Sequence, residues 1–199
     1  MFQMMYGCQI PFPERMQEGY EILGNLIVSN VSAEKIEAVM RHFICMHEEP
    51  IFFILELPLG LDEEKKMQGE NVTAFHNAVY YIDGCTQEEA LTILDEIGPL
   101  AINDGFCEFG FGGHKSQDEI MSKRYNEINI FSKDIDGFRD FMAEHQIEKV
   151  DHLVTAWNTF TKEHPGQCDL IELDGKNIYS FLDDFSEWGI YKAEIRERC

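Results

Sequence analysis

Residues able to bind a metal lie close together near position 45. His42, Cys45 and His47 supply two imidazoles and a thiol, and Glu48 and Glu49 follow directly. Structural zinc sites use four ligands, usually as paired Cys or His residues at fixed spacing, and residues four apart share a helix face. His42 and His47 are five apart, and a histidine near a helix C-terminus already interacts favourably with the helix dipole. The sequence therefore predicts no metal and no cofactor here.

A glycine-rich segment at 110–116 resembles a phosphate-binding loop, because it ends in a Lys-Ser pair. That loop requires Gly directly before the Lys and again five residues earlier, but this chain has His114 and Phe109 at those positions. We therefore expect a flexible turn in which Gly112 and Gly113 adopt positive φ. Because loops held by rigid elements often carry function, residues 110–125 remain a candidate binding segment.

Cys85 is the residue most suited to nucleophilic chemistry. It follows a turn at the start of a predicted helix, where the helix dipole favours the thiolate, and we expect a lowered pKa. The sequence contains no nucleophile-elbow motif and no identifiable histidine partner for Cys85. Adjacent carboxylates such as Glu63 and Glu64 point in different directions on a helix or strand, so they predict solvated faces rather than an acid/base pair. These features weigh against an enzyme.

The charge balance restricts the class of partner. The 199 residues include 16 Lys and Arg against 37 Asp and Glu, which gives a formal net charge of −21. Affinity for nucleic acid and for anionic membranes comes from basic residues, so both partners are disfavoured. A basic protein is the electrostatically favoured partner; simple solubility is the alternative explanation of the acidity.

The N-terminal residues lack the basic and apolar regions of a signal peptide, and the apolar run at 51–55 is too short to span a bilayer. The six cysteines are scattered and form no CxxC pair. We therefore expect a cytoplasmic protein with free thiols.

The strands and helices predicted around these residues indicate an α+β fold. The apolar patterns predict strands at 23–29, 51–57, 79–82 and 106–111, and helices that begin at Ser32 and at Thr86, the second with a full capping box and an interruption at Gly98 and Pro99. The segments 32–67 and 86–121 share one layout. The sequence thus predicts a mixed or antiparallel sheet with helices packed on it, built from a duplicated strand-helix-strand unit and ferredoxin-like in order.

Beyond residue 122 the patterns predict further strands at 127–131, 153–157 and 190–195, helices around Phe138 and at 180–188, and a hairpin that turns at Asp174 and Gly175. We expect a single domain over 1–199, with sub-units 20–67 and 78–121, a C-terminal extension 122–199, and a charged, mobile connection at 60–71. Aromatic residues on predicted strands are expected in the core: Phe52, Phe53, Phe106, Phe109, Phe111 and Trp157.

The leading hypothesis is a non-catalytic acidic binding protein, such as an immunity or inhibitor protein that docks a basic partner. The first alternative is a small enzyme or ligand-binding domain with its site at 110–125, helped by His76, His152 or Asp83. The second is a homo-oligomer subunit with residues 51–57 at a buried sheet interface. The candidate binding residues are Asp62, Glu63, Glu64, His114, Asp118, Glu119 and Trp188.

Overall fold

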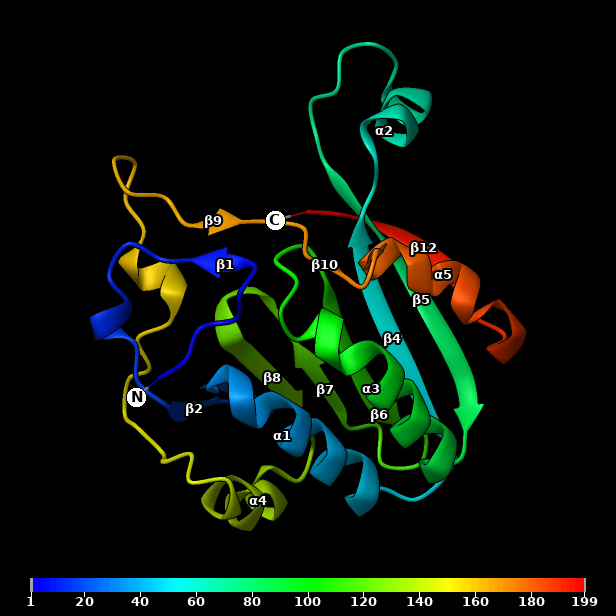
Figure 1. Ribbon diagram of the computed structural model, residues 1–199. Coiled ribbons are helices and arrows are strands. Elements are labelled where there is room, and N and C mark those ends of the chain that lie inside the picture. Colours follow the sequence, from blue (N-terminus) through cyan, green and yellow to red (C-terminus); the bar gives the residue numbers. More distant parts are fainter. Residues whose placement is uncertain (1, 199) are drawn as a thin grey trace.

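A computed structural model describes residues 2–198. Eight strands form one sheet in the order β12-β5-β4-β6-β7-β8-β3-β2, in which every neighbouring pair is antiparallel. Figure 1 shows α1 and α3 side by side across one face of this sheet. The prediction of an α+β fold with helices packed on an antiparallel sheet is confirmed.

The strands are β1 (Cys8–Gln9), β2 (Gly19–Leu23), β3 (Leu26–Asn30), β4 (Ile51–Pro58), β5 (His76–Cys85), β6 (Glu108–Gly113), β7 (Glu119–Ser122), β8 (Glu127–Phe131), β9 (Gln167–Cys168), β10 (Glu172–Leu173), β11 (Lys176–Asn177) and β12 (Tyr191–Glu197). The α-helices are α1 (Ala33–Met46), α2 (Leu61–Gln68), α3 (Gln87–Ala101), α4 (Phe138–Glu144) and α5 (Phe181–Asp184). Short 3-10 turns are η1 (Pro13–Arg15), η2 (Arg124–Asn126), η3 (Ile135–Gly137), η4 (Ala156–Thr159), η5 (Ile178–Ser180) and η6 (Ser186–Trp188).

Helix α3 begins as the sequence predicts but does not break at Pro99. Thr86 Oγ1 accepts a hydrogen bond from the Glu89 amide, and the Glu89 carboxylate accepts one from the Thr86 amide. This reciprocal pair satisfies two amide groups that a helix start leaves free. Pro99 lies in the last turn, where the missing N–H costs a single hydrogen bond, so the helix continues to Ala101.

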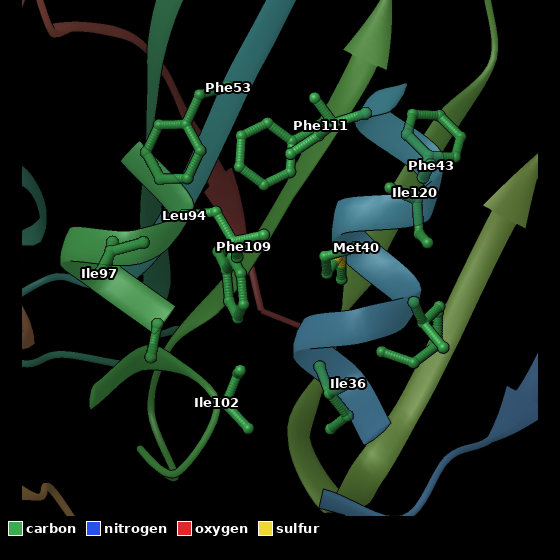
Figure 2. Packing of buried hydrophobic residues seen from close by; sticks show 14 of the residues in the cluster. Ile36, Met40, Phe43, Phe53, Leu94, Ile97, Ile102, Phe109, Phe111 and Ile120 are labelled. Atoms are coloured by element: carbon green, nitrogen blue, oxygen red, sulfur yellow. The ribbon is translucent and has the colours of Figure 1, made fainter. Parts of the chain in front are cut away.

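The core lies between the sheet and the two long helices (Figure 2). Alternate residues of β4 and β6 point toward the helices, among them Phe53, Phe109 and Phe111, and all three are fully buried. Ile36 and Leu94 meet them from α1 and α3. Each such side chain contributes about 1.5–3 kcal/mol on burial, so this layer holds the helices on the sheet.

The two predicted strand-helix-strand units occupy different places in the sheet. In the second unit, β5 and β6 are parallel and flank β4, with α3 crossing between them. In the first unit, β3 and β4 are separated by β6, β7 and β8. The ferredoxin-like duplication is therefore not confirmed. Both edges of β4 pair within this chain, so the 51–57 strand offers no free edge to a second copy.

Gly110, Gly112 and Gly113 lie on strand β6, and the turn comes after them, at residues 114–116. Gly110 and Gly112 face away from the helices, and neither Gly112 nor Gly113 has positive φ; Gln117 does, at 63°. A Cβ on Gly110 would lie 1.9 Å from the Ile120 carbonyl oxygen on β7, and one on Gly112 would lie 2.1 Å from the Phe52 ring. The glycines therefore allow close approach within the sheet. Phe52 covers Gly112 and is only half-buried.

Several other local predictions are corrected by the structure. The expected strand at 23–29 is a hairpin of β2 and β3, because Gly24 turns the chain with φ of 67°. Residues 153–157 form no strand, and Trp157 lies on η4 with 48% of its surface exposed instead of in the core. Phe106 precedes β6 and is half-buried. The hairpin at Asp174 and Gly175 is confirmed as β10 and β11.

Candidate functional site

A pocket of about 410 Å³ opens where β5 ends and α3 begins. The end of β5 supplies Asp83 and Cys85, the first turn of α3 supplies Glu89, and η6 supplies Glu187 and Trp188. We call this site the acidic pocket. Its remaining lining residues are Ile82 and Gly84.

The carboxylates of the acidic pocket are held in different ways. Glu89 belongs to the capping box of α3, and its hydrogen bonds to Thr86 lower its pKa. Asp83 accepts a hydrogen bond from the Tyr191 hydroxyl, which fixes it against β12. Among residues 2–198, no Lys or Arg forms an ion pair with Asp83, Glu89 or Glu187. The pocket thus holds fixed negative charge, and none of its described lining residues is a Lys or an Arg.

Trp188 and Cys85 also line the acidic pocket, beside these carboxylates. Trp188 is 38% exposed and packs edge-to-face on Phe185, so its indole forms a partly exposed wall. Burial, followed by the charges of Glu89 and Asp83, raises the pKa of Cys85 to about 11. The expected lowering of this pKa is therefore wrong, because burial and two carboxylates outweigh the helix dipole. At neutral pH the thiol stays protonated and is a poor nucleophile.

His114 lies beside the acidic pocket. Its Nε2 lies 3.4 Å from Asp83 Oδ1, and its ring packs on Phe52. A smaller hollow of about 270 Å³ beside it is lined by His114, Gln117 and Asp118. The structure thus places one residue of the 110–125 segment next to the acidic pocket.

The other candidates in that segment have structural partners. Asp118 Oδ2 lies 3.1 Å from Nε2 of the buried His47, whose Nδ1 lies 2.7 Å from the Phe43 carbonyl oxygen. Glu119 lies on β7 on the sheet face opposite the helices, where burial raises its pKa. The potential metal ligands near position 45 also have separate partners: His42 contacts His145, and His47 contacts Asp118. Within residues 2–198 no group of three potential ligands could hold a metal ion.

Asp62, Glu63 and Glu64 lie on α2, which projects from the sheet on the connection between β4 and β5 (Figure 1). Asp62 and Glu63 are exposed, but Glu64 is fully buried. Its carboxylate accepts hydrogen bonds from the His76 amide at 2.5 Å and from Gln68 Nε2 at 2.8 Å, and lies 2.9 Å from His76 Nδ1. Glu64 therefore fastens α2 to β5 and does not face solvent.

We expect α2 to loosen in acid through Glu64. Burial opposes its ionised form, but hydrogen bonds from His76 and Gln68 outweigh burial and lower the pKa of Glu64 below 4.5. The stabilisation is then fully present above pH 4.5 and is lost as the pH falls through the lower, folded-state pKa. The protection factor of the His76 amide, which compares the observed exchange rate with the intrinsic rate at the same pH, should fall over that interval. Glu64→Gln should give a low protection factor at every pH, and the exposed Glu63→Gln should behave as wild type; a wild-type protection factor that does not change with pH would contradict this role.

A second hollow, of about 390 Å³, lies on the sheet face opposite the helices, and no pattern in the sequence predicts it. Arg196 Nη1 lies 2.8 Å from Glu56 Oε1, and Arg124 lies 3.4 Å from Glu108. We call it the mixed-charge groove, because Lys123, Arg124, Arg196 and Arg198 face Glu56, Glu108, Glu127 and Glu197, with Trp157 beside them. Its acids and bases neutralise one another, so it has no strong preference for ligand charge.

In residues 2–198 no helix is long and apolar enough to cross a membrane. No family model, curated protein or solved structure matches this chain.

Proposed function

We propose that this chain is a non-catalytic acidic binding protein that docks a basic protein partner, with a Lys or Arg side chain of the partner entering the acidic pocket. One observation carries the proposal: three carboxylates and an indole line one concave site, and the lining contains no Lys or Arg among residues 2–198. An immunity or inhibitor protein that covers the basic surface of a nuclease is the kind of binding protein that fits.

The chemistry of the pocket suits a cation with a flat or compact head group. A guanidinium can donate two parallel hydrogen bonds to a carboxylate and can stack on an indole. Contact of a cation with Trp contributes about 0.5–2 kcal/mol, depending on how far it is desolvated. Asp83 and Glu187 contribute carboxylates to the lining of the pocket and Trp188 contributes an indole, so the groups that both interactions need are present.

The net charge of −21 supports the same partner class. A strongly negative protein attracts a basic partner over long distances, which raises the association rate and makes binding sensitive to salt. In a nuclease inhibitor, carboxylates would occupy positions that nucleic-acid phosphates otherwise take. The mixed-charge groove gives less support, because its basic residues already neutralise its acids.

A direct test uses the fluorescence of Trp188. Trp157→Phe leaves Trp188 as the only tryptophan, and this chain is titrated with a tri-arginine peptide. We expect a saturable change in emission with Kd on the order of 1 mM. The affinity for the peptide should fall several-fold as salt rises.

A tri-glutamine peptide of the same length is the control and should give no saturable change. An equal response to both peptides, no response to tri-arginine, or a Kd that is independent of salt would each reject the proposal.

A further inference from the structure

Two cysteines from distant parts of the chain face each other in a short strand pair outside the main sheet. β1 and β9 are antiparallel, and Cys8 and Cys168 are direct partners in their register. Their Sγ atoms are 3.6 Å apart. Directly opposed residues in an antiparallel pair have Cβ atoms about 4.5–5.5 Å apart, and a disulfide needs about 3.5–4.5 Å. A small movement of two short strands would therefore bring the sulfurs into bonding distance.

The two sulfurs are chemically unequal. Hydrogen bonding from Cys8, assisted by Tyr125 and Arg124 and opposed by burial and Asp169, lowers the pKa of Cys168. The same contact and burial raise the pKa of Cys8. Cys168 is half-buried and Cys8 is buried. This arrangement supplies an accessible attacking thiolate beside a second thiol that can resolve an intermediate.

The other described cysteines lack such a partner. Cys45 is exposed, and burial raises the pKa of both Cys85 and Cys107. Within residues 2–198, Cys8 and Cys168 are the only cysteine pair with sulfurs in contact. Oxidation should therefore be selective.

We propose that Cys8 and Cys168 are an oxidisable dithiol that a small disulfide, such as glutathione disulfide, converts to an intrachain disulfide. The Cys168 thiolate attacks one sulfur of glutathione disulfide and releases one glutathione thiolate. Cys8 then loses its proton, attacks the Cys168 sulfur of the mixed disulfide and releases the second glutathione. The two cysteine sulfurs are oxidised, glutathione disulfide is reduced, and the two thiol protons pass to the two glutathione molecules.

The crosslink would fasten the N-terminal segment to the segment after η4. That contact is already made by a backbone hydrogen bond from the Asp169 amide to the Gly7 carbonyl. Because the linked positions are far apart in sequence, the crosslink restricts the unfolded chain strongly. The oxidised protein should melt about 10 °C higher than the reduced protein.

The test treats the reduced full-length chain with glutathione disulfide in excess, blocks free thiols with N-ethylmaleimide, and maps peptides by mass spectrometry. We expect a linked peptide pair containing Cys8 and Cys168, a mass loss of about 2 Da, and the higher Tm. Cys45→Ser, the matched control, should behave as wild type, and Cys8→Ser should stop at a glutathione adduct on Cys168.

Outcomes on the wild-type chain decide the proposal even if a variant folds poorly. A linkage through Cys45 or Cys199 in place of the 8–168 pair would overturn it. So would complete alkylation of both residues after oxidation, or a glutathione adduct on Cys168 that never resolves while Cys8 is present.

Discussion

Replacing Asp83 with Asn and Glu187 with Gln should weaken binding of the tri-arginine peptide by about 10-fold or more. Each carboxylate can accept a charge-assisted hydrogen bond from a guanidinium, and loss of about 1.4 kcal/mol corresponds to a tenfold rise in Kd. Asn and Gln keep an acceptor oxygen and the size of the side chain. The Tyr191 hydroxyl can therefore still donate a hydrogen bond to residue 83. Glu89 is left unchanged because it caps α3.

The matched control removes one Asp and one Glu charge from a different part of the surface. Asp62→Asn with Glu63→Gln removes two exposed carboxylates from α2, so the net charge is the same as in the pocket variant. Its Kd should stay within about twofold of wild type. The two α2 carboxylates do not line the pocket, so they contribute only long-range attraction to the peptide, which salt screens. A larger loss in the α2 variant than in the pocket variant would move the docking surface to α2. Equal losses would show that only net charge matters.

Gly110→Ala should lower the free energy of unfolding by about 3 kcal/mol or more, at the upper end of overpacking costs. The added Cβ would lie 1.9 Å from the Ile120 carbonyl oxygen and 2.7 Å from Met121 Sδ. Ile120 belongs to β7, which is held by pairing on both sides. The backbone oxygen cannot rotate away as a side chain can, so the two strands must separate locally.

Gly112→Ala provides the contrast, because its added Cβ meets the Phe52 ring and no backbone atom is nearer. We expect a loss of about 1–3 kcal/mol, and adding Phe52→Ala should recover part of it. Urea unfolding of the two single variants and the double variant measures the coupling. Phe52→Ala should give no relief to Gly110→Ala. Strictly additive effects of Phe52→Ala and Gly112→Ala would contradict this account of the glycine pattern.

The parts of the fold that were predictable are those in which local signals agree. The Ser32 and Thr86 caps lie before apolar residues at helical spacing, and α1 and α3 begin where those signals place them. The prediction of a flexible turn is wrong for Gly112 and Gly113, which lie on β6, because glycine serves both turns and crowded strands. Only the neighbouring Ile120 carbonyl and the Phe52 ring, which belong to other strands, distinguish the two cases.

The site was less predictable than the fold. Trp188 is one of the binding candidates from the sequence, and it lines the acidic pocket. Asp83 and Glu89 belong to a segment a hundred residues away in the chain, and no spacing rule connects them to Glu187. The Cys85 pKa was mispredicted for the same reason, since the burial that raises it comes from tertiary packing.

The place of β12 in the sheet has a consequence for biosynthesis. β5 is a ten-residue strand whose outer edge, within residues 2–198, pairs with β12 alone, and ribosomes synthesise those pairing residues long after β5. Until then, a row of backbone donors and acceptors beside Val79, Tyr80 and Tyr81 is open to pairing with another nascent chain. Productive folding of this protein therefore competes with aggregation for as long as translation takes to reach β12, and slower elongation would lengthen that period.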